Sequence, residues 1–402
     1  LDTTKIPALG PWLESRRLLP VQRLDLAPGE SSSLEPIPGY NGPRLVSAGP
    51  QGAVTVCRAP SVEWRIGMPS ASERRGLWSL ALPENPRFTG PIAGARRYGA
   101  SRIHQLGVLL RQFAAIDKAE PCADMLLRAS WIVERQALGQ LAEPVENIVD
   151  DAMFVAKPAQ METLNRIVRR CRERERIAEV LGPSARAAFR PGVRALFSGP
   201  PGTGKSLGAA WLATKLHLPL FRVDLATISS KYIGETEKNL ARLFDQAEQS
   251  EVVLLFDEAD ALFSKRTGVH DYHDKFANAQ TNYLLERMES FGGIAILTTN
   301  NDGAIDTAFL RRLDFSLEFA NPGPQERRAL WLSHLGNSHT LDHGQINRLA
   351  ALLDWSGGHI RNAVLHAASM HGAIGWTEVV GGVKIEAAKL RVTVPIELLD
   401  GG

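Results

Sequence analysis

The 402-residue sequence predicts an α/β fold in which helices cover a parallel β-sheet. Beyond residue 182, short β-rich apolar runs alternate with helical stretches, the pattern of parallel α/β sheets. A glycine-rich loop, LFSGPPGTGKS at 196–206, lies between such a run and a helical stretch, and the run VVLLFDEAD at 252–260 ends in acidic residues. Because parallel sheets bind ligands at the carboxyl ends of their strands, the two segments predict one shared site.

Composition excludes several classes of protein. The hydrophobic content of 44% and charged content of 22% are typical of a soluble globular protein, and a net charge of +2 gives no general attraction to nucleic acid or membrane. Cys57, Cys122 and Cys171 form no CxxC pair, which favours reduced thiols and a cytoplasmic location. No apolar run approaches the roughly 20 residues of a membrane span, and no signal peptide opens the chain. Because residue 1 is Leu, we expect a fragment, an engineered version or a processed product.

The glycine-rich loop fits the pattern G-x-x-x-x-G-K-[ST] from Gly199 to Ser206. Its glycines allow backbone N–H groups to surround phosphates, and the following helix directs its positive end at the same anion. Lys205 is predicted to reach the β- and γ-phosphates and the Ser206 hydroxyl to bind Mg²⁺. A chance glycine-rich turn is the alternative, which the flanking strand and helix disfavour. The predicted nucleotide-binding residues are Gly199, Pro200, Pro201, Gly202, Thr203, Gly204, Lys205, Ser206 and Leu207.

Acidic and amide side chains follow two further strand-like runs. After VVLLF, Asp257 is placed to hold Mg²⁺ directly or through water, and Glu258 to orient and deprotonate an attacking water. The run IAILTTN ends in Asn300, which could hydrogen-bond that water or the γ-phosphate; taken alone, such an asparagine is more often a turn former. Together the segments predict a nucleotide-hydrolysing site.

Two phrases recur far apart in the chain. PSASERRGLWSL at 69–80 and PGPQERRALWLS at 322–333 share Pro, then Glu-Arg-Arg, then Leu-Trp. A second spacing matches as well, because an alanine precedes an isoleucine by ten residues in both places: Ala93 and Ile103, Ala350 and Ile360. Chance similarity of two amphipathic helices is the alternative, but the matched second spacing favours a repeated unit. The intervening charge run RRCRERER at 169–176 predicts a solvated helix face with Glu–Arg pairs.

Residues from about 139 to 392 resemble the AAA+ ATPases, most closely the protein-remodelling group with katanin and spastin. In this resemblance GPPGTGKS is the Walker A motif, LLFDEAD the Walker B motif and Asn300 sensor 1. SKYIGETEKNLARLFDQA at 230–247 matches the central pore loop and the helix behind it. IDTAFLRRLDF at 305–315 matches the segment that carries the arginine fingers.

The arginine-finger and lid segments carry their own site residues. Family members often read RxGRF where this chain has a shortened form, so Arg311 and Arg312 share the finger prediction. SGGHIRNAVLHAA at 356–368 matches the lid helix, and Arg361 stands where many AAA+ proteins keep sensor 2.

The resemblance implies a three-layer αβα core of the P-loop NTPase type at 139–322 and a C-terminal helical lid at 323–402. It also implies hydrolysis of ATP with Mg²⁺ and ATP-dependent assembly into a ring, expected to be a hexamer. Because the repeated phrase marks the passage from sheet to lid, residues 69–138 are predicted as the lid and linker of an earlier, degenerate AAA+-like module. Residues 1–68, which lack both Walker motifs, are predicted as its truncated remnant.

Two kinds of motor remain open. A ring that remodels, disassembles or threads proteins needs an aromatic and an aliphatic pore residue. The predicted pore loop, Lys231, Tyr232 and Ile233, supplies them as Tyr232 and Ile233. A nucleic-acid motor or loader would more often present basic residues there, so a protein substrate is favoured. Whole-chain features are also similar to bacterial AAA+ ATPases of phage-tail-like contractile injection systems.

Two weaker patterns accompany these motifs. HDYHD at 270–274 has metal-ligand residue types, but a solvated loop explains the same composition. Asp150 and Asp151 stand where related proteins form part of the adenine pocket, and a helix N-cap explains them equally well.

Overall fold

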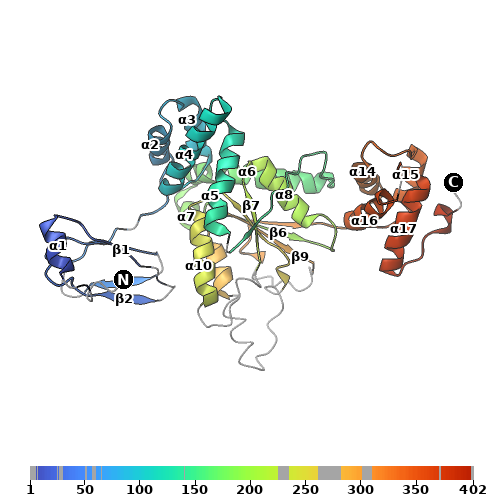
Figure 1. Ribbon diagram of the computed structural model, residues 1–402. Helices are drawn as coiled ribbons and strands as arrows, with labels where there is room; N and C mark the ends of the chain where they lie inside the picture. The colour runs from blue at the N-terminus through green and yellow to red at the C-terminus, as the bar shows by residue number, and fades with distance from the viewer. Residues whose placement is uncertain are drawn as a thin grey trace, which may run out of the picture.

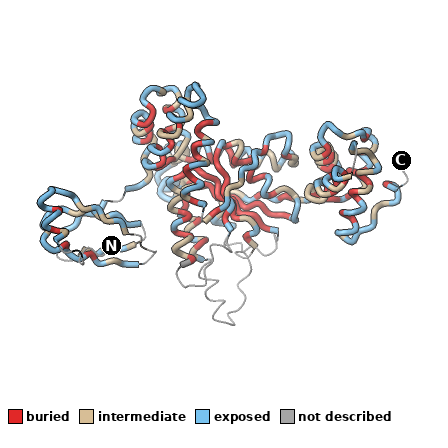
Figure 2. Tube along the Cα trace, viewed as in Figure 1, coloured by how far each residue is buried: buried red, intermediate tan, exposed pale blue. Residues whose placement is uncertain are grey.

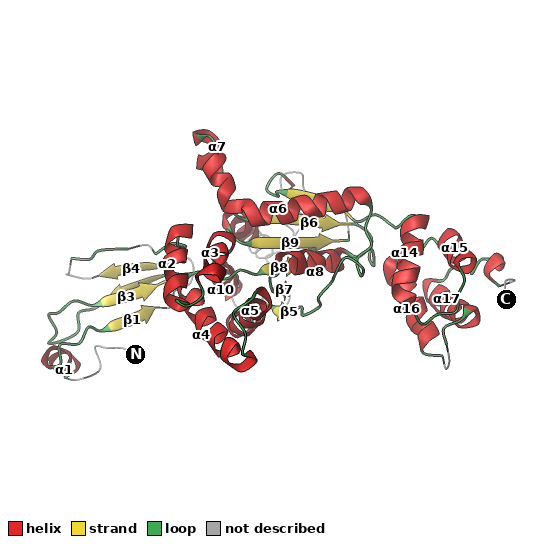
Figure 3. Ribbon diagram, turned by 90° about the horizontal axis from the view of Figure 1, so that it is seen from above, coloured by secondary structure: helices red, strands yellow, loops and turns green. Residues whose placement is uncertain are grey.

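The computed structural model describes most of the chain, in segments that leave out several loops. The described residues are 6, 8–24, 26, 30–49, 52–56, 60–64, 66–139, 141–224, 235–260, 282–300, 310–370 and 373–399. Figure 3 shows N-terminal strands, a central sheet and C-terminal helices following one another across the molecule. Within the described residues, no helix is long and apolar enough to cross a membrane.

The central sheet has the strand order β10-β6-β9-β8-β7-β5. Its strands are β5 (Glu143–Pro144), β6 (Val193–Ser198), β7 (Leu220–Val223), β8 (Val253–Phe256), β9 (Ile294–Thr299) and β10 (Phe315–Glu318). All neighbours pair in parallel except β5, which pairs antiparallel with β7. Strands β8 and β9 are buried along their whole length, as expected for central parallel strands (Figure 2). The predicted α/β fold with a parallel sheet is confirmed; the antiparallel edge strand was not predicted.

Helices cover both faces of this sheet. Helices α6 (Pro158–Val180) and α8 (Lys205–Leu216) pack on one face, where Trp211 shares a core with β6. Helix α10 (Glu235–Glu248) packs on the other face, where Phe244 stacks on Phe256. A helical stretch at 282–290 packs on the same face as α10, with Leu284 and Met288 in its core, whereas the short helix α7 (Pro183–Ala188) has no buried residue. The arrangement is the three-layer αβα core that the resemblance implies.

Helix α6 corrects one prediction. Its charge run was expected to be a solvated face, but Arg174 is 4% exposed and forms an ion pair with the buried Glu251. The neighbouring Glu175 pairs with Arg74 from the N-terminal part of the chain. The alternation of charges is therefore partly a buried interface, because the partners come from distant segments that composition does not reveal.

Two four-helix units flank the sheet, one on each side in sequence. The N-terminal unit contains α2 (Ala71–Ala81), α3 (Pro86–Ala95), α4 (Ala100–Asp117) and α5 (Ala123–Leu138). The C-terminal unit contains α14 (Pro324–Leu335), α15 (His343–Leu352), α16 (Gly357–Ala368) and α17 (Trp376–Leu390), followed by the short η3 (Ile396–Leu398). Each unit has its own apolar core, and Figure 1 shows them on different sides of the sheet.

The N-terminal region is β-rich. It contains α1 (Leu9–Ser15), β1 (Val21–Leu24), β2 (Ser31–Leu34), β3 (Leu45–Ala48) and β4 (Ala53–Val56). The strands form two separate parallel pairs, β1 with β3 and β2 with β4, rather than one larger sheet. The origin of residues 1–68 as a remnant of a degenerate module, like the other domain boundaries, stays a prediction.

Candidate active site

The glycine-rich loop connects β6 to α8 and requires glycine at three positions. Gly199, Gly202 and Gly204 have φ angles of +135°, +76° and +97°, where other residues are strained. A Cβ atom on Gly199 would lie 2.2 Å from the carbonyl oxygen of Phe319, so a side chain has no room there. The loop therefore has the strand–loop–helix geometry that surrounds phosphates with backbone N–H groups.

Lys205 begins α8 and is 8% exposed. Its Nζ donates hydrogen bonds to the carbonyl oxygens of Gly199 at 2.7 Å and Pro200 at 2.9 Å, and to Oδ1 of Asn300 at 2.8 Å. All three acceptors are neutral, so an incoming phosphate would replace them with anionic oxygens. The predicted phosphate-binding lysine and the sensor asparagine are thus adjacent.

Ser206 in the first turn of α8 lies beside Asp257, which follows β8. The Ser206 hydroxyl donates to Asp257 Oδ1 at 3.1 Å, and a hydroxyl with a carboxylate is a ligand set suited to Mg²⁺. These two residues would hold the ion, which would supply positive charge to offset the negative charge of the phosphates. Thr203 and Leu207 flank this point: Thr203 Oγ1 donates to the Pro200 carbonyl oxygen at 2.8 Å, and Leu207 is 40% exposed.

Glu258 follows β8 in a strained backbone conformation. Its φ angle is +52°, which is uncommon for a residue other than glycine, and its side chain is exposed. The Glu258 N–H donates to Thr298 Oγ1 at 3.0 Å, and that same hydroxyl donates to Asp257 Oδ1. Thr298 on β9 therefore positions the Asp257 carboxylate and the backbone of Glu258.

Sequence reasoning missed Thr298 and Asp260 as supporting residues. Asp260 Oδ1 accepts hydrogen bonds from the Asn300 N–H at 3.0 Å and from the Thr299 hydroxyl. Both threonines are buried, at 1% and 0% exposure. Two hydroxyl residues in an otherwise apolar buried strand were the available signal, because buried hydroxyls need partners.

We expect Thr298→Val to lower the turnover number about tenfold while changing ATP affinity less than about threefold. The substitution keeps the shape but removes the hydroxyl that positions Asp257 and Glu258, and a tenfold effect corresponds to about 1.4 kcal/mol. Steady-state kinetics against Thr163→Val, a partly exposed threonine of α6 whose hydroxyl bonds the Ala159 carbonyl oxygen, provides the comparison. Unchanged turnover in Thr298→Val would remove this positioning role.

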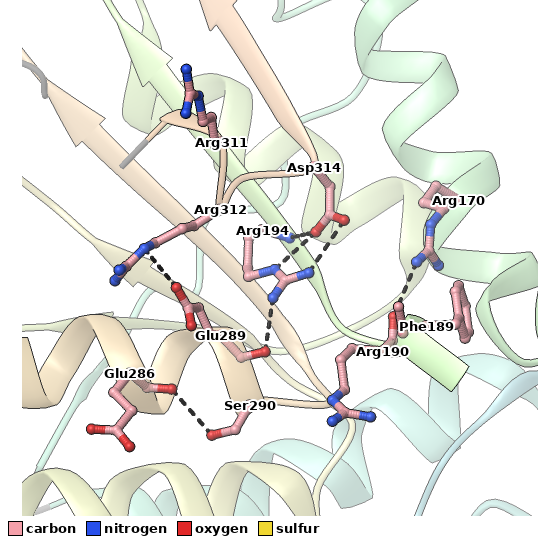
Figure 4. Close-up of a pocket in the computed structure, with 11 residues that line it drawn as sticks. Arg170, Phe189, Arg190, Arg194, Glu286, Glu289, Ser290, Arg311, Arg312 and Asp314 are labelled. Carbon is pink, nitrogen blue, oxygen red and sulfur yellow. Dashed lines mark hydrogen bonds and ion pairs between the residues drawn. The ribbon is translucent and has the colours of Figure 1, made fainter. Parts of the chain in front are cut away.

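The two predicted finger arginines, drawn in Figure 4, precede β10, whose first residue pairs with Ala195 near the start of β6; the phosphate loop follows the other end of β6. They border an open pocket of about 610 Å³. Its lining residues are Arg170, Ala188, Phe189, Arg190, Arg194, Glu286, Glu289, Ser290, Arg311, Arg312 and Asp314. Five of these are arginines against three acidic residues, so the pocket carries an excess of positive charge. Phosphate chemistry is placed at one end of the sheet and a basic surface at the other.

Within this pocket, Arg311 and Arg312 differ. Both are exposed, but Arg312 pairs with Glu289 at 2.7 Å, whereas Arg311 points away from Glu289 in Figure 4. Arg194 holds the base of the turn, bonding Asp314 at 3.0 Å and the carbonyl oxygen of Glu289 at 2.8 Å. The turn that presents both arginines is thus fastened to the strand that leads to the phosphate loop.

The C-terminal helices contact the phosphate loop directly. The Gly358 N–H donates to the Gly202 carbonyl oxygen at 2.9 Å, and a Cβ on Gly202 would lie 2.7 Å from Ser356 Oγ. Arg361 is exposed and bonds Asn362 Oδ1 at 3.4 Å. It lies close enough to His334 that, after burial, its charge is the second cause lowering the pKa of that histidine. The sensor 2 role of Arg361 stays a prediction.

The remaining predictions fall outside this geometry. The pore-loop residues Lys231, Tyr232 and Ile233 and the HDYHD segment lie outside the described residues. In the part of the chain that is described, no group of three or more His, Cys, Asp or Glu residues is placed to hold a metal.

The two aspartates before the sheet have structural partners. Asp150 Oδ1 accepts the N–H groups of Ala152 at 2.9 Å and Met153 at 3.0 Å. Asp151 bonds Lys215 at 2.6 Å and Trp211 Nε1 at 2.8 Å, and these bonds lower the pKa of Asp151. Asp150 therefore caps a turn rather than a helix, because the next helix, α6, begins at Pro158, and the adenine-pocket interpretation stays a prediction.

Comparison with known proteins identifies the central part of the chain. Residues 195–321 match the model of the ATPase family associated with various cellular activities (AAA). An uncharacterized AAA family ATPase of Sinorhizobium fredii is 41% identical over 32% of this chain and 38% of its own length. Proteasome-activating nucleotidase 2 of Halobacterium salinarum is 32% identical over 43% of this chain and 44% of its own length.

A third relative, spastin of Drosophila virilis, is 31% identical over 48% of this chain and 26% of its own length. The chain thus spans less than half the length of each of these relatives. The matched residues include the phosphate loop, both acidic residues after β8, Asn300 and both arginines of the basic pocket. Residues 195–321 are therefore similar to the AAA family of ATPases, and spastin is one of the relatives that this part of the chain resembles.

Proposed function

We propose that this protein is an ATP-hydrolysing ring motor that remodels or threads protein substrates. The observation that carries the proposal is the division of the site between two ends of β6. Six residues of strand rise about 20 Å, so Arg311 and Arg312 stand far from their own phosphate loop. A neighbouring copy would place these arginines at a γ-phosphate, which requires a ring or a filament; we propose a hexamer.

The residues of one chain have distinct parts in hydrolysis. Lys205 and the loop N–H groups bind the β- and γ-phosphates, with Ser206 and Asp257 holding Mg²⁺. Glu258 accepts the proton of the attacking water, and Asn300 orients that water or the γ-phosphate. The neighbour's arginine stabilises negative charge that develops on the transferred group, an effect worth on the order of 10³–10⁵ in rate in GTPases.

A protein substrate is supported by charge and by one relative. The net charge of +2 offers no general attraction to nucleic acid, and one relative is named as a proteasome-activating nucleotidase. A cytoplasmic location and service to a phage-tail-like contractile injection particle are finer proposals, which rest on the resemblance of the sequence. A nucleic-acid motor is the second candidate, and the following test separates the two.

We expect Tyr232→Ala to hydrolyse ATP at nearly the wild-type basal rate but to lose stimulation by an unfolded protein. An aromatic pore residue grips a polypeptide by ring contact, so Tyr232→Phe should keep most of the stimulation. The measurement is ATPase rate with an unfolded protein, single-stranded DNA or double-stranded DNA. Lys231→Ala is the matched variant, because a charge-driven nucleic-acid motor would depend on Lys231 and lose stimulation steeply with salt. Stimulation by DNA alone, lost in Lys231→Ala and retained in Tyr232→Ala, would refute the protein motor.

A further inference from the structure

The two four-helix units are built around the same buried arginine. Arg74 and Arg327 each donate from Nη1 to the carbonyl oxygen of the proline five residues earlier, and from Nε to an alanine carbonyl near the end of the next helix. The acceptors are Pro69 at 2.6 Å and Ala93 at 3.0 Å for Arg74, and Pro322 at 2.9 Å and Ala350 at 2.7 Å for Arg327. The same atoms thus join the same two helices in both units.

The agreement extends to all four helices. Trp78 and Trp331 are both fully buried, four residues after the arginines. In each unit, a glutamate of the fourth helix with no exposed side-chain surface meets a basic residue at the third position of the third helix. The pairs are Arg102 with Glu134 at 3.3 Å and His359 with Glu386 at 2.9 Å. Such agreement between non-adjacent residues identifies α2–α5 as a second lid.

The segments that precede the two units share an alternation of apolar residues, but these residues are buried in one segment and exposed in the other. Val62, Trp64 and Ile66 alternate as Phe315, Leu317 and Phe319 do. Leu317 and Phe319 are 6% and 2% exposed because β10 joins the sheet, whereas Trp64 and Ile66 are 75% and 95% exposed. The segment before α2–α5 thus keeps the sequence pattern of a strand that leads into a lid, but its described residues, 61–64 and 66, form no strand.

The two lids use one face differently. In α14–α17, the start of the third helix faces the phosphate loop through the Gly358–Gly202 hydrogen bond. In α2–α5, the corresponding face lies on the ATPase core: the Gly99 N–H donates to the Gln249 carbonyl oxygen at 3.0 Å. A Cβ on Gly99 would lie 2.0 Å from Gln249 Oε1, so the contact is close. Where the C-terminal lid faces a nucleotide site, the second lid holds the loop between α10 and β8.

Ser250, the next residue of this loop, also makes polar contacts with the second lid. Arg102 donates to Ser250 Oγ at 3.3 Å and to Gln246 Oε1 at 3.2 Å, and Glu134 accepts a hydrogen bond from Ser250. Burial raises the pKa of Glu134, although Arg102 and Ser250 act against that shift. In the C-terminal lid the equivalent pair, His359 and Glu386, joins the third helix to the fourth. In the second lid the pair Arg102 and Glu134 does the same and also bonds Ser250 of the core.

Ion pairs complete the docking. The Arg97 N–H and Arg174 both bond Glu251, which is 3% exposed and lies just before β8. Arg97 also bonds Glu175 at 3.0 Å and the Gly292 carbonyl oxygen at 2.7 Å. Opening this lid would break the contacts that Arg97 makes with Glu251, Glu175 and Gly292 and the ion pair of Arg74 with Glu175, while Glu251 would keep Arg174. The contacts therefore oppose any opening of this lid.

We propose that α2–α5 is a permanently closed lid, whose nucleotide-facing surface has become a docking surface for residues 249–251 of the ATPase core. It binds no nucleotide and stays on the core through the ATP cycle. The C-terminal lid, in contrast, must leave the phosphate loop for nucleotide to enter and depart.

The test is a disulfide between Gly99→Cys and Gln249→Cys in a background with Cys57→Ser and Cys122→Ser. Gln249→Cys also removes the side-chain oxygen that a Cβ atom at position 99 would meet. Burial raises the pKa of the remaining Cys171 to about 12, so that thiol stays protonated and unreactive. We expect the bond to form without nucleotide and turnover to stay within about twofold of the reduced protein. Calorimetric titration should find one nucleotide per chain, and none in Lys205→Ala.

The matched control joins the other lid to the core with Ser333→Cys and Ala152→Cys, where the serine hydroxyl lies 3.5 Å from the Ala152 carbonyl oxygen. Oxidation of this pair should slow turnover at least about tenfold, reversibly on reduction. The proposal is overturned if the 99–249 bond fails to form, if oxidising it stops turnover, or if Lys205→Ala retains a nucleotide. Equal tolerance of both disulfides would overturn the distinction between the lids.

Discussion

Glu258→Gln is expected to lower ATP turnover by about 10²–10⁴-fold, the range of general-base catalysis, while leaving ATP tightly bound. The amide keeps the shape of the side chain but cannot accept the proton of the attacking water. Because the Glu258 N–H bonds Thr298 through the backbone, the positive φ angle and the position of the side chain should survive the substitution. Single-turnover hydrolysis and equilibrium binding of ATP separate the two effects.

Glu162→Gln is the matched control for this variant. Glu162 is an exposed carboxylate of α6 that pairs with Arg166 on the same helix, and such exposed pairs contribute little to stability. Its turnover should equal that of the wild type. Turnover by Glu258→Gln within about threefold of the wild type would assign the base to another residue.

Lys205→Ala is expected to weaken ATP binding at least about a hundredfold, a loss of about 3 kcal/mol. The substitution removes the only side chain of the phosphate loop that carries a fixed positive charge. Its neighbours, the Gly199 and Pro200 carbonyl oxygens, would then face the phosphates without the intervening ammonium. Binding of a fluorescent ATP analogue measures the effect.

Lys215→Ala tests whether charge alone on the same helix explains the loss. Lys215 lies at the other end of α8, pairs with Asp151, and should leave ATP affinity unchanged when replaced. Thermal unfolding of both variants shows whether the buried position of Lys205 affects folding. Wild-type affinity in a folded Lys205→Ala protein would contradict the assigned phosphate site.

The site could be predicted from sequence where its residues stand at fixed spacing. The loop from Gly199 to Ser206 and the acids after β8 are local patterns whose strand and helix context is visible in the chain. Thr298 and Asp260 were missed because their hydrogen bonds join segments about 40 residues apart. No local pattern reports such a contact.

The same reason explains the error at α6. Arg174 looked like part of a solvated charge run, but its partner Glu251 is 77 residues away, and Arg97 reaches that carboxylate from 154 residues away. The repeated phrase predicts a repeated unit, and Arg74 and Arg327 within it make equivalent hydrogen bonds. The docking of that unit on the core could not be predicted, because it depends on which distant carboxylates become buried.

The most direct test of the account is a mixing experiment between two inactive variants. The first variant carries both Arg311→Ala and Arg312→Ala, so its phosphate site is intact but it supplies no arginine to a neighbour. Glu258→Gln supplies arginines but cannot hydrolyse its own ATP. In a ring, a site of the first variant beside a subunit of the second is complete, so ATPase activity should appear on mixing and pass through a maximum with the mixing ratio. If mixed assemblies form and no ratio restores activity, the ATP site is not completed by a neighbouring copy and the ring motor is contradicted.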